Sequence, residues 1–156
     1  MVYLISGKRG AGKSTYAKRL ADEYIAKGQQ AIIVDGDEVR ELWPNDFTDE
    51  GRINNLTNIA KICALIEYQG AVAIAACVSP KKEWRQMMRT FWAESRLVYI
   101  PGGTLWEGTE YEWPDSEELM YQTRTYPVAN LKEAKKSVSL DASTNIHIKS
   151  GSNVVS

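Results

Sequence analysis

Residues 7–14 have the sequence Gly7-Lys8-Arg9-Gly10-Ala11-Gly12-Lys13-Ser14, which fits the pattern G-x-x-x-x-G-K-[ST] of a phosphate-binding loop. Glycines let such a loop turn several backbone N–H groups toward a phosphate chain, because they tolerate positive φ without a Cβ clash. The pattern predicts that Lys13 reaches the β- and γ-phosphate oxygens of ATP and serves catalysis, and that the Ser14 hydroxyl ligates Mg²⁺. The candidate ATP-binding residues are Gly7, Lys8, Arg9, Gly10, Ala11, Gly12, Lys13, Ser14 and Thr15.

The segments on either side of this loop have the composition that it requires. Residues 2–6 (VYLIS) form an apolar, β-favouring run. Residues 14–26 favour a helix, with Tyr16, Leu20 and Tyr24 at intervals of four, and the positive end of that helix dipole points at the same anion. The plain alternative is a glycine-rich turn between a strand and a helix, but the combined pattern favours a nucleotide site.

Length and composition indicate a single globular domain. The chain has 156 residues, 44% hydrophobic and 25% charged, with a net charge of −1, so no overall field attracts nucleic acid. We expect a P-loop kinase domain over residues 1–142, with residues 143–156 as a tail or an edge strand. No apolar run approaches the roughly 20 residues that a membrane helix needs, and we expect a cytoplasmic protein. Cys63 and Cys77 are interpreted as buried apolar residues, and His147 as a residue without a catalytic role.

Further along the chain, strand-like and helix-like segments alternate. The uniformly apolar residues 71–78 are typical of a strand that is covered on both faces. The order predicts an α/β fold with a three-layer parallel sheet, the P-loop NTPase architecture of nucleotide kinases. The expected strands are residues 30–34, 71–78 and 97–100; the expected helices are residues 38–43, 52–68 and 79–94.

Three polar positions follow the ends of predicted strands, namely Gly7, Asp35 and Ser79. Ligands bind at the carboxyl ends of the strands in such sheets, so these positions are expected to border one crevice. A kinase also needs a carboxylate that orients or deprotonates the acceptor or holds Mg²⁺, and Asp35 is placed for either task, with Arg40 one helical turn beyond Asp37. The alternative for Asp35-Gly36-Asp37 is a turn with a helix N-cap.

Two motifs resemble the adenylylsulfate (APS) kinase family, whose members transfer the γ-phosphate of ATP to the ribose 3′-hydroxyl of adenosine 5′-phosphosulfate. The family's D-G-D-N-V-R is similar to DGDEVR at residues 35–40, and its F-x-x-x-D-R-x-E-N resembles FTDEGRINN at residues 47–55. The resemblance continues through the V-S-P of residues 78–80 and covers about residues 1–90.

The resemblance implies roles for individual residues. Asp35 is the implied catalytic carboxylate and, with Ser14, an implied Mg²⁺ ligand. Phe47 is implied to stack on the substrate purine. The other implied substrate-binding residues are Arg40, Arg52 and Asn55, for the sulfophosphate and ribose, and Val78 and Ser79, for backbone contacts.

The sequence departs from the family pattern after residue 100. The family has a lid rich in Lys and Arg with a second phenylalanine, whereas residues 101–114 here are acidic and aromatic. The second ring on the purine is then expected from Trp106, with Tyr111 and Trp113 as weaker alternatives. Asn54 also replaces the family's glutamate, and Thr57 and Asn58 replace its paired arginines.

The resulting prediction is an ATP- and Mg²⁺-dependent phosphotransferase of the APS kinase type with a small nucleotide substrate. Two alternatives stay open: a P-loop kinase for another hydroxyl acceptor, such as a nucleoside, a modified base or a nucleic-acid end, and a nucleotide-binding protein without kinase activity. Nucleic acid is not the favoured partner, no membrane partner is expected, and a homodimer is compatible with the sequence.

Overall fold

The computed structural model describes residues 1–105 and 108–123 of the chain. The predicted boundary at residue 142, the segment 143–156 and His147 therefore lie outside the described residues. The elements are β1 (Val2–Gly7), α1 (Lys13–Ala26), β2 (Ala31–Asp35), α2 (Gly36–Leu42), α3 (Asp49–Tyr68), β3 (Val72–Cys77), α4 (Lys82–Arg89), β4 (Glu94–Ile100) and β5 (Gln122–Thr123).

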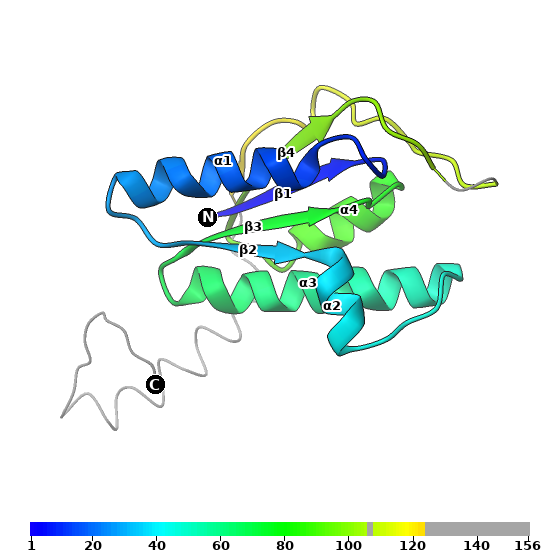
Figure 1. The fold of residues 1–156 in the computed structure, drawn as a ribbon, viewed down its shortest axis with the longest axis horizontal. Helices are drawn as coiled ribbons and strands as arrows, with labels where there is room; N and C mark the ends of the chain where they lie inside the picture. The colour runs from blue at the N-terminus through cyan, green and yellow to red at the C-terminus, as the bar shows by residue number, and fades with distance from the viewer. Residues whose placement is uncertain (106–107, 124–156) are drawn as a thin grey trace.

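The strands form one sheet in the order β2-β3-β1-β4-β5. β1 lies in the middle and pairs in parallel with β3 on one side and with β4 on the other, and β2 pairs in parallel with β3. The short β5 runs antiparallel along β4. Because the parallel strands share one direction, their carboxyl ends meet at one edge, where Figure 1 also shows α2.

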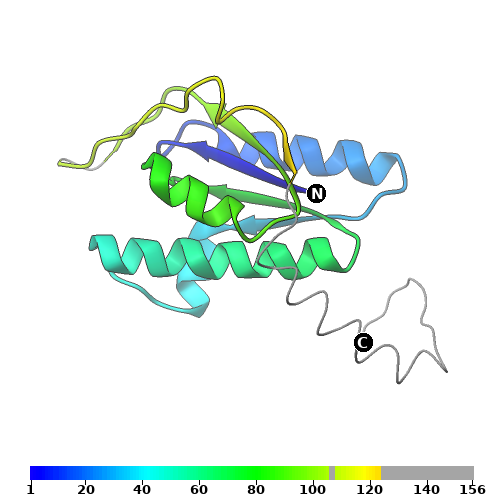
Figure 2. The same cartoon turned by 180° about the vertical axis from the view of Figure 1, so that it is seen from behind.

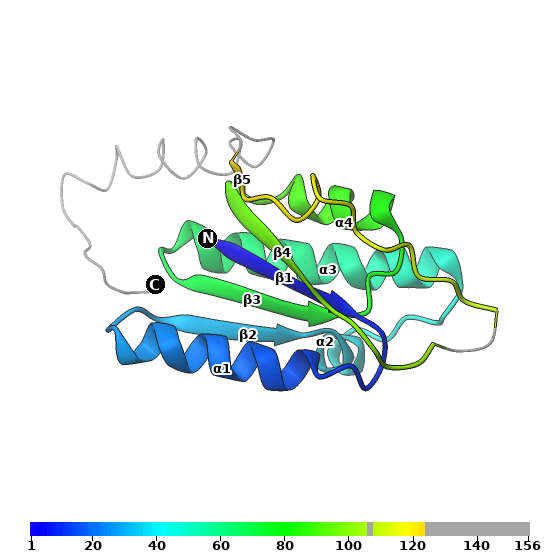
Figure 3. The same cartoon turned by 90° about the horizontal axis from the view of Figure 1, so that it is seen from above.

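Helices cover both faces of the sheet, and this confirms the predicted three-layer architecture. Figure 3 shows α1 on one side of the strands and α3 and α4 on the other, and α3 and α4 lie next to each other in Figure 2. Ile5 and Ile74 point toward α1, whereas Leu4 packs with Ile59 and Trp92 on the opposite face. All six residues of β3 are buried, as expected for a strand between two helical layers.

The helix boundaries differ most from the predicted ones at α3 and α4, and α2 begins at Gly36 rather than at residue 38. α3 begins at Asp49 rather than at residue 52, because the Thr48 hydroxyl accepts a hydrogen bond from the Gly51 N–H and caps the helix. α4 begins at Lys82 and ends at Arg89, so residues 79–81 and 90–94 are not part of it. The Glu67 carboxylate accepts the N–H groups of Ala93 and Glu94, which directs this stretch into β4 instead of a longer helix.

Residues 101–123 fold back along the sheet without a helix in their described part. Thr104 pairs with Arg9 of the phosphate loop in an isolated antiparallel bridge. Further on, the buried Arg89 donates to the carbonyls of Glu118 and Met120, which brings the chain to the sheet edge and β5. No helix in the described part of the chain has the length and hydropathy needed to cross a membrane.

Candidate active site

The phosphate loop connects β1 to α1 as the sequence predicts. Gly12 caps α1 with φ of 105°, a left-handed conformation that L side chains rarely adopt. The Lys13 ammonium lies back across the loop and donates to the Lys8 carbonyl at 2.7 Å. Burial lowers the pKa of Lys13 from its ordinary value, and the positive charge of Arg9 acts in the same direction. The loop therefore concentrates positive charge at the start of α1.

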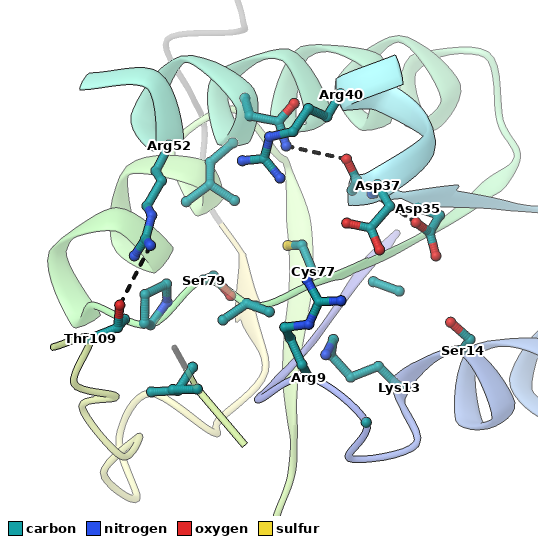
Figure 4. Close-up of a pocket in the computed structure, with 18 of the residues that line it drawn as sticks. Arg9, Lys13, Ser14, Asp35, Asp37, Arg40, Arg52, Cys77, Ser79 and Thr109 are labelled. Carbon is teal, nitrogen blue, oxygen red and sulfur yellow. Dashed lines mark hydrogen bonds between the residues drawn. The ribbon is translucent and has the colours of Figure 1, made fainter. Parts of the chain in front are cut away.

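A cavity of about 400 Å³ opens at the carboxyl ends of the parallel strands, between this loop, α2 and α3. Figure 4 shows cationic side chains from the loop and from both helices directed into the same space as the carboxylates after β2. The predicted site residues that line it are Arg9, Gly10, Gly12, Lys13, Ser14, Thr15, Asp35, Arg40, Phe47, Arg52, Asn55, Val78 and Ser79. Segments distant in the sequence thus contribute to one site.

Asp35 ends β2 and has a structural task as well as a place in the cavity. Its carboxylate caps α2 by accepting the N–H of Asp37 at 2.8 Å and that of Glu38 at 3.4 Å. The two interpretations of the Asp-Gly-Asp stretch are therefore compatible, because an N-cap aspartate also borders the cavity. Asp37 lines the cavity too and is a second carboxylate at the same end of the sheet.

The other half of the cavity combines an aromatic ring with guanidinium and amide groups. The Arg40 guanidinium lies 4.3 Å from the centroid of the Phe47 ring, which is 44% exposed. Arg52 donates to the Thr109 hydroxyl at 3.5 Å, a contact drawn in Figure 4. Asn55 is buried and donates to the Gly36 carbonyl at 3.3 Å.

Two buried polar atoms on this side have no hydrogen-bond partner among the described residues, Arg40 Nε and Asn55 Oδ1. Unsatisfied buried groups cost about 1–3 kcal/mol each, and most native structures contain few of them. Both residues line the cavity, so a polar ligand there would remove this cost.

Ser79 is fixed by a short chain of buried hydroxyl groups. The Ser6 hydroxyl lies 2.7 Å from that of Ser79 and 2.5 Å from the phenol of Tyr111. Burial raises the pKa of Tyr111 to about 12, so the phenol stays protonated. This network joins β1, the loop after β3 and the segment 101–123 directly below the cavity.

The positions of Tyr111 and Trp113 do not support either residue as the second stacking ring. Tyr111 is buried with its ring 5.5 Å from that of Tyr99, and Trp113 is 73% exposed beside the same tyrosine. Neither ring lines the cavity formed by the described residues. Trp106, the first choice, lies outside the described residues.

Three predicted loop residues, Gly7, Lys8 and Ala11, belong to the loop but do not line the cavity. Several residues without a predicted role do line it. Leu105 and Thr109 follow the last predicted strand, and Trp84 lies in the predicted helix of residues 79–94, for which the sequence suggests no site role. Cys77 is buried like Cys63, as predicted, yet it also borders the cavity, where burial raises the pKa of its thiol to about 12.

The oxygen ligands available for a metal ion are the Ser14 hydroxyl and the carboxylates of Asp35 and Asp37, which face one cavity. Mg²⁺ prefers such oxygen ligands and is usually bound by one or two carboxylates together with substrate phosphates and water. In the part of the chain that the structure describes, no cluster of three or more His, Cys, Asp or Glu side chains could hold an ion alone. The residues present therefore fit Mg²⁺ brought with a nucleotide.

A glycine-rich phosphate loop between the central strand and the first helix of a parallel three-layer sheet defines the class, a P-loop protein of the kinase type. The family model described as adenylylsulphate kinase matches residues 1–121. The chain belongs to this family, and the resemblance predicted from its two motifs is confirmed.

One curated relative and two solved structures illustrate the similarity. The adenylyl-sulfate kinase of Bacillus licheniformis is 38% identical over 100 residues, which are 62% of this chain and 51% of the relative. The crystal structure of APE1195 has a TM-score of 0.61 at 28% identity and covers 92% of this chain and 75% of its own. The Mycobacterium tuberculosis APS kinase CysC in complex with AMPPNP and APS shares the fold, with a TM-score of 0.60 at 23% identity over 64% of this chain and 61% of that one.

The matched part spans only about half the length of the curated relatives. Activity, substrates and partners of the whole protein are therefore taken up as proposals.

Proposed function

We propose that this protein is an ATP-dependent phosphotransferase that moves the γ-phosphate of ATP to the 3′-hydroxyl of adenosine 5′-phosphosulfate. The observation that carries the proposal is the single cavity with two chemically different halves. Lys13 and the phosphate loop line one half, and Arg40, Phe47 and Asn55 line the other. Such a cavity suits two nucleotide-like ligands, one in each half, that meet where the halves join.

On the donor side, the loop N–H groups and Lys13 bind the phosphate chain of ATP. Phosphoryl transfer needs little covalent help from the protein, so catalysis depends on positioning and on stabilising the charge of the phosphoryl oxygens. The partly buried Lys13 ammonium serves that purpose, because a charge acts more strongly where water is scarce.

On the acceptor side, Arg40 and Arg52 neutralise the sulfophosphate and Phe47 stacks on the purine. Asn55 Oδ1, which has no hydrogen-bond partner in the described part of the chain, accepts a hydrogen bond from a ribose hydroxyl, and the Arg40 Nε–H donates to an acceptor oxygen. Val78 and Ser79 offer backbone groups at the floor of the cavity, where Ser79 is fixed by Ser6 and Arg85.

Asp35 lies between the halves and orients the acceptor hydroxyl and receives its proton. Ser14 and Asp35, with Asp37 beside them, would hold Mg²⁺, which neutralises the negative charge of the phosphates when bound. The observation that Asp35 caps α2 means that its carboxylate is already fixed in direction before any ligand binds.

A second candidate function, phosphorylation of another hydroxyl acceptor, rests on the segment after β4. Residues 101–123 contain no Lys or Arg, so this stretch lacks the cations expected to close over a sulfophosphate. The acceptor in that case is a nucleoside or a nucleic-acid end. Family membership favours APS, and a homodimer stays a prediction.

The test is a coupled assay of ADP release with Mg-ATP and with APS, nucleosides or oligonucleotides as acceptors. We expect APS to raise the rate of ADP release far above the rate that the protein shows with Mg-ATP alone, when water is the acceptor. Release stimulated by another acceptor but not by APS would replace the APS assignment. ATP binding without stimulation by any acceptor would identify a nucleotide-binding protein without kinase activity.

A further inference from the structure

Arg9 is a cation inside the phosphate loop that the loop pattern itself does not require. It occupies one of the four variable positions of G-x-x-x-x-G-K, where any residue satisfies the motif. The structure nevertheless places Arg9 among the residues that line the cavity. Figure 4 shows its side chain directed from the loop into that cavity, on the side of Lys13.

The backbone of Arg9 is fixed by the segment that follows β4. Arg9 N donates to the Thr104 carbonyl at 3.0 Å, and Thr104 N donates to the Arg9 carbonyl at 2.9 Å. Gly103 packs so closely on the loop that a Cβ there would lie 2.4 Å from Arg9 O and 3.0 Å from Ala11 N. The start of the Arg9 side chain is therefore set before any nucleotide binds.

The distribution of charge around the cavity indicates which cations can face the donor phosphates. Residues 101–123 carry only acidic charges and contribute just Leu105 and Thr109 to the described cavity lining. Arg40 packs on Phe47 and Arg52 contacts Thr109, so both lie toward the acceptor half. Of the three cations of the donor loop, Lys8, Arg9 and Lys13, the last two line the described cavity.

We propose that Arg9 is a catalytic residue that contacts the γ-phosphoryl group during its transfer, an arginine finger built into the phosphate loop; this rests on the phosphotransferase function proposed above. In the transfer, the bond from the γ-phosphorus to its bridging oxygen breaks and ADP keeps the electron pair. The acceptor oxygen forms the new bond to phosphorus, and its proton passes to Asp35. Arg9 donates hydrogen bonds to the phosphoryl oxygens throughout, where fork-shaped, permanently charged donors are most effective.

The first test compares two nucleotides that differ only at the γ-position. Arg9→Ala is expected to weaken binding of Mg-AMPPNP by about 10–100-fold, the effect of losing charge-assisted hydrogen bonds. Binding of Mg-ADP should stay within about threefold, because ADP lacks the group that Arg9 contacts. Titration calorimetry measures both affinities without any acceptor. Equal weakening of both nucleotides, or of neither, would overturn the proposal.

The second test is kinetic. Arg9→Ala should lower kcat by about 10²–10³-fold with less change in the KM of the acceptor, and Arg9→Lys should recover only part of the loss. Lys27→Ala is the matched control: it also removes one positive charge, but at the far end of α1, about 20 Å away, and should leave kcat unchanged. A loss confined to the acceptor KM would assign Arg9 to the acceptor anion instead and overturn the proposal.

The proposal of APS as acceptor and the proposal for Arg9 can be contradicted independently of each other. A wild-type protein that binds AMPPNP but does not phosphorylate APS would contradict the proposed acceptor, and the comparison of AMPPNP with ADP would still decide the contact of Arg9. Thermal melting of Arg9→Ala, expected within a few degrees of wild type for this exposed side chain, confirms that the comparison is made on folded protein.

Discussion

Arg85 and Glu118 form an ion pair with two hydrogen bonds, Nε to Oε1 at 2.7 Å and Nη2 to Oε2 at 3.1 Å, and both side chains are completely buried. The same guanidinium donates to the carbonyl of Ser79 at 2.9 Å and to that of Glu112 at 2.8 Å. One side chain of α4 therefore fixes both the floor of the cavity and the acidic segment after β4.

Removing one partner of this pair should destabilise the fold strongly. Glu118→Ala leaves the Arg85 charge buried without its carboxylate, which typically costs about 3–5 kcal/mol. We expect a marked fall in the free energy of unfolding, measured by urea denaturation. Glu117→Ala, at an exposed neighbouring position, should change it by no more than about 0.5 kcal/mol. Similar unfolding curves for the two variants would show that the pair adds nothing to stability.

Gly51 provides a second test of stability. A Cβ at this position would lie 2.2 Å from Asp46 Oδ1 and 2.4 Å from the Asp46 carbonyl oxygen, and the carbonyl belongs to the backbone. Gly51→Ala should therefore destabilise the protein by about 1–3 kcal/mol, although alanine favours helices more than glycine does.

Asn54→Ala serves as the control for this substitution, because Asn54 is exposed in the same helix and alanine there should be neutral or slightly stabilising. The melting temperatures of the two variants, compared with wild type, measure the change in stability. A stabilised Gly51→Ala variant would mean that helix propensity outweighs the close approach of Asp46.

The sequence predicts the sheet, its helical layers and most of the cavity lining because local patterns determine them. The apolar run of β3 and the glycines of the phosphate loop each follow from the chemistry of a few consecutive residues. The C-terminal limit of α4 does not, since it depends on Glu67, more than twenty residues away, which accepts the N–H groups of Ala93 and Glu94.

The segment after β4 escapes prediction for the same reason. Its course is set by Arg85 and Arg89, which donate to its backbone carbonyls. Carbonyl groups are present at every residue, so no side-chain pattern marks the ones that are bonded. The burial of Tyr111 below the cavity, where the sequence suggested a stacking ring, has this origin.

The role of Asp35 can be separated from its capping of α2. Asn caps helices about as well as Asp, so Asp35→Asn should keep the bond from the Asp37 N–H and the melting temperature. Acceptor phosphorylation should fall by about 10²–10⁴, the range for a positioned general base, with ATP affinity within roughly tenfold. Asp37→Asn is the companion variant. Surviving activity in Asp35→Asn, together with loss in Asp37→Asn, would transfer the catalytic role to Asp37.

The last prediction concerns recognition of the acceptor base. Each stacked aromatic face contributes about 1–3 kcal/mol to the binding of a base. Phe47 offers one face, because its ring lines the cavity and is held against Arg40. Phe47→Ala should raise the KM for APS by about five- to a hundredfold while ATP binding barely changes, and Trp106→Ala should do the same if its ring supplies the second face.

Phe47→Leu separates stacking from simple apolar contact, since leucine keeps most of the volume without the ring. We expect it to lie closer to Phe47→Ala than to wild type, because the flat face and its contact with Arg40 are both lost. Steady-state assays with APS on wild type and the three variants measure these effects. If APS turnover does not respond to Phe47→Ala, the purine is not stacked on this ring, and recognition must then depend on Arg40, Arg52 and the buried amide of Asn55.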